Sequence, residues 1–189
     1  MKTNRLEAFS DGVLAIIITI MVLELKVPEE ATLEALIPKI PVFVSYIISF
    51  LYLGIYWNNH HHLFMITEKV NGKTLWANLH LLFWLSLIPF VTSWVGEHYI
   101  TKVPLAFYGF VLLMSGIAYF ILQATIIKHH DEDFALRKAI GKNLKGKLSL
   151  IIYALGILLS FVNHWLAIAC YFFVAVMWII PDKRIEKKY

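Results

Sequence analysis

Long apolar stretches separated by short polar segments dominate the pattern of this chain. The first, residues 6–25, contains 20 residues, about what a helix needs to cross a ~30 Å hydrocarbon core at ~1.5 Å per residue. Five more apolar stretches follow, at about residues 41–62, 74–95, 104–127, 148–162 and 165–180. The pattern predicts an all-α integral membrane protein with six transmembrane helices, forming one transmembrane domain over residues 1–189.

Turn signals between the stretches support this division. Asn71-Gly72 favours a turn before the third stretch, and Pro41 suits the first turn of the second helix. Residues 31–37 are expected to form a short surface helix. Only Asn163-His164 separates the last two stretches, so we expect them to form an antiparallel hairpin.

Composition agrees with a membrane protein. Apolar residues make up 59% of the chain, charged residues 16%, and the mean hydropathy is +0.68. The single cysteine, Cys170, excludes a disulfide framework or a cysteine-based metal site. The net charge of +4 does not indicate nucleic-acid binding, because the basic residues lie in the connections between apolar stretches.

The basic residues are distributed unevenly between the two sides of the membrane. Fourteen lie before the first stretch, between the second and third, between the fourth and fifth, or after the sixth. The remaining connections carry only Lys26, Lys39 and Lys102. Because basic residues accumulate in cytoplasmic loops, we expect both termini in the cytoplasm of a multi-pass plasma-membrane protein.

The first stretch has two different faces. At about 100° per residue, Ile16, Ile20 and Leu23 form an apolar stripe with Thr19 on its flank. Ser10 and Asp11 project from roughly the opposite side. Periodicity alone leaves open whether the stripe faces lipid or lines a pore.

Three polar clusters are expected at the same membrane depth, near the cytoplasmic ends of the first three helices. They are Ser10 with Asp11, residues 58–62, and Asn78. Unpaired polar groups in a membrane are costly, so we expect a hydrogen-bonded network. In this network Ser10 and Asp11 would accept hydrogen bonds from side chains among His60, His61, Asn78, Trp57 and Trp76.

The run His60-His61-His62 permits an alternative interpretation as an integral membrane enzyme that binds a metal or haem through His60 and His61. Neighbouring helical residues point about 100° apart, which disfavours three of them sharing one ion. The sequence contains no glycine-rich phosphate loop and no nucleophile elbow. We therefore expect no enzymatic activity, catalytic residue, bound metal or cofactor.

Three motifs resemble the transmembrane protein 175 family, which comprises the lysosomal potassium channel and its bacterial homologues. They are Arg5-x-x-x-Phe9-Ser10-Asp11-Gly12, Trp57-Asn-Asn-His60-His61, and Asn78 followed by Pro89-Phe90. The match covers the first three stretches well and the last three only by hydropathy. For Arg5, Ser10, Asp11, Trp57, His60, His61 and Asn78, the resemblance implies a structural role in packing the helices.

The resemblance also implies a function. It suggests a potassium-preferring cation channel, permeable to other monovalent cations, in which the first helix of each subunit lines the pore of a homotetramer. The family's constriction corresponds to Ile16, Ile20 and Leu23, with Thr19 as a rival polar layer. The sequence lacks a Thr-Val-Gly-Tyr-Gly segment, so a cage of backbone carbonyls is not expected to select potassium.

Overall fold

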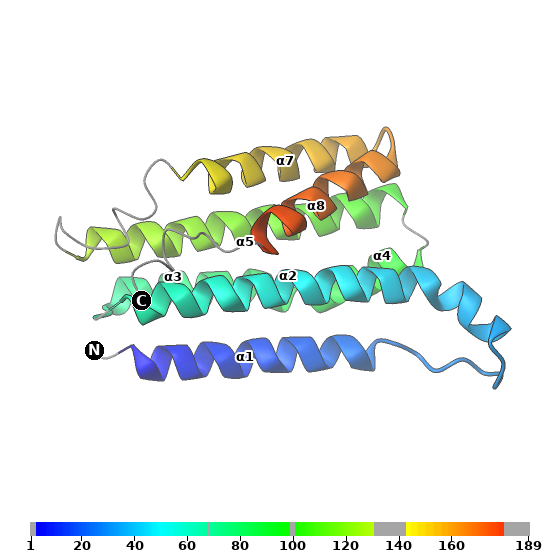
Figure 1. The fold of residues 1–189 in the computed structure, drawn as a ribbon, viewed down its shortest axis with the longest axis horizontal. Coiled ribbons are helices and arrows are strands. Elements are labelled where there is room, and N and C mark those ends of the chain that lie inside the picture. The colour runs from blue at the N-terminus through cyan, green and yellow to red at the C-terminus, as the bar shows by residue number, and fades with distance from the viewer. Residues whose placement is uncertain (1–2, 68, 99–100, 131–142, 180–189) are drawn as a thin grey trace.

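The structure, a computed structural model, describes residues 3–67, 69–98, 101–130 and 143–179. Within these ranges all regular secondary structure is helical, and most helices run along one common direction (Figure 1). The α-helices are α1 (Asn4–Leu23), α2 (Ile40–Met65), α3 (Gly72–Ser86), α4 (Ile88–Glu97), α5 (Lys102–Lys128), α7 (Leu144–Ser160) and α8 (His164–Ile179). A 3₁₀ helix, η1 (Glu34–Lys39), precedes α2.

The third apolar stretch differs from the expected continuous helix. It is divided into α3 and α4, which meet at Leu87. Pro89 explains the break, because its ring lacks an N–H and would clash with the carbonyl of Leu85 four residues earlier. At the junction, the Leu87 N–H donates to the Trp84 carbonyl oxygen over 3.2 Å. The stretch therefore runs from residue 72 to residue 97 as two helical pieces.

The connection between α1 and α2 also differs in detail. The short helix expected at residues 31–37 is the 3₁₀ helix η1, which starts later and includes Pro38. α2 then begins at Ile40 with Pro41 in its first turn, where a missing N–H breaks no helical bond.

Within the described residues, four helical stretches are long and apolar enough to cross a membrane: α1, η1 with α2, α3 with α4, and α5. α7 and α8 have 17 and 16 residues. At ~1.5 Å per residue they reach roughly 25 Å, somewhat less than a typical hydrocarbon core. The central residues of the expected loop between α5 and α7, and the basic C-terminal segment, lie outside the described residues.

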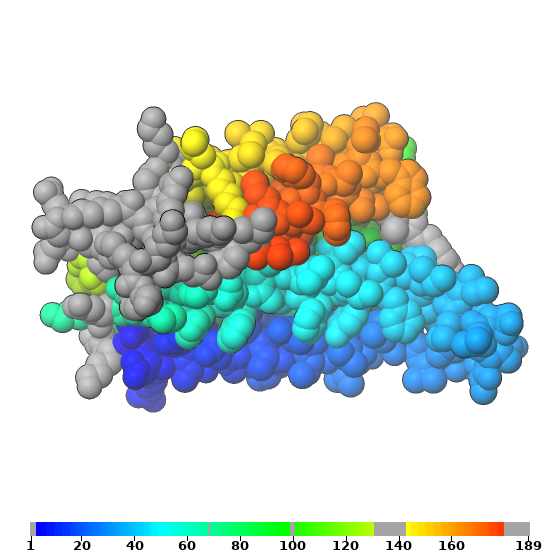
Figure 2. All heavy atoms as spheres, in the orientation of Figure 1, coloured from blue at the N-terminus to red at the C-terminus, as the bar shows by residue number. Residues whose placement is uncertain are grey.

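α1 forms one edge of the protomer, and α7 with α8 forms the opposite edge (Figure 2). α1 packs on α2, α3 and α4, while α5 lies between the α3–α4 pair and the α7–α8 hairpin. The Asn163 side chain accepts hydrogen bonds from the N–H groups of Trp165 and Leu166, which fixes the start of α8 after the tight turn.

Tyrosines fill much of the core beneath the hairpin. Tyr171 of α8 is 2% exposed and lies where Gly109 and Gly156 leave room for its ring. A Cβ at Gly109 would overlap the Tyr171 hydroxyl, and one at Gly156 would overlap the Tyr171 ring. These two glycines therefore allow α5, α7 and α8 to approach one another closely.

Candidate functional site

One face of α1 is buried against the rest of the protomer, and the other is exposed. The buried residues recur at spacings of three and four, as expected for one helical face: Leu6, Ser10, Leu14, Ile17 and Met21.

The exposed face carries the stripe identified in the sequence. Ile16, Ile20 and Leu23 are 59%, 42% and 80% exposed, whereas the adjacent Ile17 is 4% exposed. Thr19 is also exposed, and its hydroxyl donates to the carbonyl oxygen of Ile16 over 2.9 Å. The protomer thus presents three large apolar side chains that its own helices do not cover.

A directional chain of hydrogen bonds joins α1, α2 and α3. The Asn78 amide nitrogen donates to the Ser10 hydroxyl over 2.9 Å, and that hydroxyl donates to the Leu6 carbonyl oxygen. The Asn78 oxygen is 2.8 Å from Nε2 of His60 and can only accept, so this histidine nitrogen carries the proton. Ser10, His60 and Asn78 are each at most 1% exposed. We call Ser10, His60 and Asn78 the buried triad.

A second set of contacts runs along the antiparallel helices α1 and α2. The Trp57 indole N–H donates to Asp11 over 3.0 Å, and Nδ1 of His61 lies 2.9 Å from a Glu7 carboxylate oxygen. Glu7 and Asp11 are four residues apart on α1, as Trp57 and His61 are on α2. Residues at this spacing share a helical face, so the two pairs lie one turn apart. We call these four residues the α1–α2 ladder.

The expected network is divided between these two clusters. As expected, Ser10 accepts from Asn78 and Asp11 accepts from Trp57. The two histidines do not bind Asp11. His60 binds Asn78, and His61 binds Glu7. Arg5 and Trp76 are exposed and lie outside these hydrogen bonds.

Sequence reasoning missed Glu7. The signal was its position one turn before Asp11, on the same face of the helix.

Comparisons with known proteins cover this region. The sequence model of the endosomal/lysosomal potassium channel TMEM175 matches residues 5–89, which include every residue of the triad and the ladder. A potassium channel from Chryseobacterium sp. (strain P1-3) is 58% identical over 187 residues, covering 99% of this chain and 97% of the relative. This chain belongs to the TMEM175 family.

Two more distant TMEM175 relatives extend the match over nearly the whole chain. A potassium channel from Streptomyces collinus is 30% identical over 186 residues, covering 93% of this chain and 90% of the relative. The crystal structure of a lysosomal potassium-selective channel TMEM175 homologue from Chamaesiphon minutus matches with a TM-score of 0.82 at 30% identity. That match covers 95% of this chain and 97% of the other. The chain is thus a multi-pass membrane protein with the TMEM175 fold.

The geometry of this TMEM175 protein gives the histidines separate partners. His60 faces Asn78 of α3 and packs on the Phe64 ring, with ring centroids 4.6 Å apart. His61 turns to Glu7 of α1 and stacks with Trp57. In the described part of the chain, no three histidine, cysteine, aspartate or glutamate side chains gather as ligands for one metal ion.

The C-terminal half of α1 lies beside an open groove of about 650 Å³ between α1 and the α3–α4 pair. Its lining includes Ile16 and Ile20 from the exposed stripe and Phe90 and Trp94 from α4.

Two polar contacts hold this end of the TMEM175 bundle. Ser93 donates to Glu24 over 3.2 Å, and Lys26 pairs with Glu97 over 2.9 Å. The hydrogen bond and charge of Glu97 raise the pKa of Lys26, so this ammonium group stays protonated at neutral pH.

Proposed function

We propose that this protein is a potassium-preferring cation channel in which the first helices of four identical subunits surround the pore. The observation that carries the proposal is the asymmetry of α1. One face is fixed to the protomer by the buried triad and the α1–α2 ladder, while Ile16, Ile20 and Leu23 project from the other. The relatives described above are potassium channels, which supports potassium as the permeant ion.

The position of α1 supports a pore between subunits. α1 lies at the edge of the protomer, so its exposed stripe cannot enclose a path within one chain (Figure 1). Copies arranged around a symmetry axis would bring their stripes together, and closed cyclic symmetry is the usual arrangement of such oligomers. Four copies is the number implied by the family resemblance. The entire chain, residues 1–189, would act as one channel domain.

The same helix supports selection without a carbonyl cage. α1 is continuous from Asn4 to Leu23, so its backbone carbonyls are largely engaged in helical hydrogen bonds. Rings of Ile16, Ile20 and Leu23 would instead constrict the pore and gate it by excluding water. Thr19 is the candidate polar layer, because its hydroxyl oxygen retains lone pairs after donating to Ile16.

The distribution of basic residues supports an orientation of the helix bundle in the membrane. The ends of α2 and α5 and the starts of α1, α3 and α7 lie at one end of the bundle (Figure 1). Arg5, Lys73, Lys128, Lys145 and Lys147 belong to these segments. The positive-inside rule places this end, and both termini, in the cytoplasm if α7 and α8 also cross the plasma membrane. Their short length is compatible with crossing where the bilayer thins slightly.

The alternative of a membrane enzyme is not supported by the comparisons, and His60 and His61 face different helices. Purified protein in liposomes tests the channel directly. We expect potassium flux that exceeds sodium flux and no haem absorption or stoichiometric metal. Absence of cation flux from correctly oriented, assembled protein would refute the proposal.

Cysteine accessibility tests which face of α1 lines the pore, in a Cys170→Ser background. Ile20→Cys should react with a water-soluble thiol reagent and lose conduction, because Ile20 would face the pore. Ile17→Cys is the matched control, since Ile17 is 4% exposed and lies in the protomer core. Equal modification of both positions, or of neither, would contradict this orientation.

A further inference from the structure

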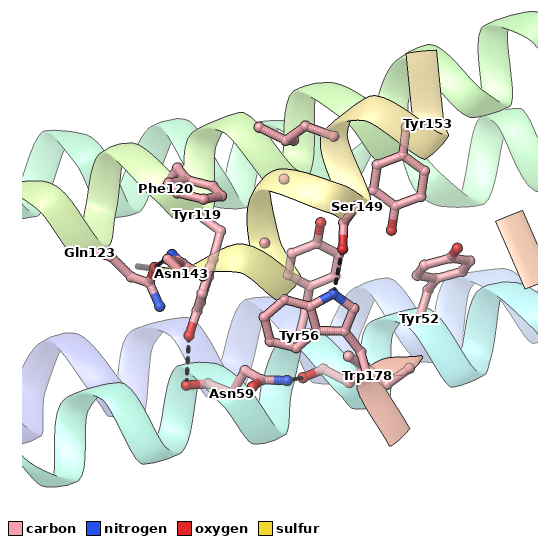
Figure 3. Close-up of a pocket in the computed structure, with 14 residues that line it drawn as sticks. Tyr52, Tyr56, Asn59, Tyr119, Phe120, Gln123, Asn143, Ser149, Tyr153 and Trp178 are labelled. Atoms are coloured by element: carbon pink, nitrogen blue, oxygen red, sulfur yellow. Dashed lines mark hydrogen bonds between the residues drawn. The ribbon is translucent and has the colours of Figure 1, made fainter. Parts of the chain in front are cut away.

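A small cavity lies inside the protomer, separate from the exposed stripe of α1. It is lined by side chains of α2, α5, α7 and α8 and by Asn143, and has a volume of about 50 Å³ (Figure 3). Its lining combines aromatic rings with hydroxyl and amide groups. Among the lining residues that the structure describes, none carries a charged side chain.

Most polar groups around this cavity bind one another directly. The Tyr119 hydroxyl donates to the Asn59 carbonyl oxygen over 3.0 Å, and the Trp178 indole N–H donates to the Ser149 hydroxyl over 2.8 Å (Figure 3). The Asn143 amide nitrogen lies 3.3 Å from the Gln123 amide oxygen, to which it donates. These contacts connect α5 with α2 and α7 with α8, and they leave the cavity between them.

The Tyr56 hydroxyl takes no part in these contacts. Its side chain belongs to a residue that is only 9% exposed, and its ring lies among the lining side chains (Figure 3). None of the hydrogen bonds between described residues around this cavity involves the Tyr56 hydroxyl, and Tyr56 borders the cavity itself. Hydroxyl groups inside proteins nearly always have a partner, and no described residue supplies one to Tyr56.

The size of the cavity identifies the class of molecule. Its volume of about 50 Å³ exceeds the ~30 Å³ that one water occupies in the liquid and is far below the ~150 Å³ of a cavity that takes benzene. Gly116 contributes to this space, because a Cβ there would lie 3.9 Å from the Tyr56 hydroxyl. A monovalent cation fits less well, since the described lining offers no carboxylate to replace its hydration.

We propose that this cavity is a hydration site in which about one or two ordered water molecules bind the Tyr56 hydroxyl and link α2 to polar groups of α5 and α7. Water would act here as a structural component between the α7–α8 hairpin and the helix that carries Trp57, His60 and His61. The proposal goes beyond ion conduction, and it holds whether or not the exposed stripe of α1 lines a pore.

A high-resolution structure of the full-length assembly in lipid nanodiscs tests this site. We expect a density peak about 2.6–3.2 Å from the Tyr56 hydroxyl oxygen, and its loss in Tyr56→Phe. Crystals soaked in thallium should show no anomalous peak there. An empty cavity, an acyl chain in it, or an anomalous thallium peak would each overturn the proposal.

Radiolytic labelling provides a second measurement that needs no variant. Radicals formed from bound water should modify Tyr56 several-fold faster than Phe64, which is 1% exposed and does not line this cavity. Gly116→Ala should lower Tyr56 labelling by filling part of the space, after the end of the Leu150 side chain shifts. Labelling of Tyr56 as slow as that of Phe64 in the wild-type protein would refute the hydration site.

Discussion

Asn78→Leu is the change that tests the role of the buried triad most directly. Asn78 is fully buried, donates to Ser10 and accepts from His60, and thereby joins three helices through one side chain. Leucine has a similar size but cannot form either bond. Ser10 would keep its hydrogen bond to the Leu6 carbonyl oxygen, whereas the Nε2–H of His60 would remain buried without its acceptor.

The expected loss follows from these two bonds. Hydrogen bonds between membrane helices contribute on average ~0.6 kcal/mol and at most ~1.7 kcal/mol each, so two give roughly 1–3 kcal/mol. Because the His60 N–H would stay buried without an acceptor, we expect a loss in the free energy of unfolding in the upper part of that range, about 2–3 kcal/mol. At ~1.4 kcal/mol for each factor of ten, the unfolding equilibrium should rise about 30- to 150-fold.

Reversible unfolding in mixed micelles, followed by tryptophan fluorescence, measures this loss. Asn58→Leu is the matched control, because Asn58 is partly exposed on α2 and lies outside the buried triad. A double-mutant cycle with His60→Phe isolates the contact. We expect a coupling energy of about 1–2 kcal/mol, because the double variant removes donor and acceptor together.

Two results would refute this reasoning. If Asn78→Leu were as stable as the wild type, the triad would not anchor α1. If the two substitutions were strictly additive, His60 and Asn78 would not interact energetically. Potassium flux per folded channel should change little in either variant, since neither residue belongs to the exposed stripe.

Three further predictions concern the stripe, the ladder and the core. Ile20→Asn should raise cation flux and weaken discrimination between potassium and sodium in single-channel recordings, because amide groups would lower the cost of dehydration at the proposed constriction. Ile17→Asn should mainly impair folding. Asp11→Ala should reduce tetramer yield in size-exclusion chromatography more than it alters selectivity, while Asp11→Asn should retain an acceptor for the indole of α2 and lose less. Gly109→Ala should lower the free energy of unfolding by about 1–3 kcal/mol, since the new methyl group would overlap the Tyr171 hydroxyl.

Each of these has a contrary outcome. A larger gain in current from Ile17→Asn than from Ile20→Asn would place the wrong face of α1 in the pore. A fully assembled Asp11→Ala channel with altered ion preference alone would assign Asp11 to the pore instead of the ladder. A Gly109→Ala variant with wild-type stability would show that Tyr171 moves aside without loss.

Much of the fold could be predicted from the sequence, because membrane insertion depends on local properties. The lengths of the apolar stretches, the tight turn at Asn163 and the all-helical class depend on hydropathy and turn propensity within short windows of sequence. The break near Pro89 shows the limit of this approach. Pro89 can be read from the sequence. The sequence alone did not predict that the third apolar stretch would divide there into two helices, α3 and α4.

The candidate site was predictable only in part. Periodicity indicated that Ser10 and the Ile16 stripe lie on different faces of the first helix, and shared depth brought Ser10, His60 and Asn78 into one cluster. It named Trp57 only as one of five possible donors to Ser10 and Asp11, and it did not indicate that His61 reaches Glu7. A sequence fixes which residues share a face of one helix, whereas pairing depends on how two helices are rotated and shifted against each other.

The same distinction applies to burial. Ile16, Ile17 and Ile20 are all isoleucine, so hydropathy does not distinguish them. Only the packing of α1 against α2, α3 and α4 buries Ile17 and leaves the other two exposed. Sequence therefore determined that this helix is apolar enough to enter the membrane, and tertiary contacts decided which of its sides remains exposed.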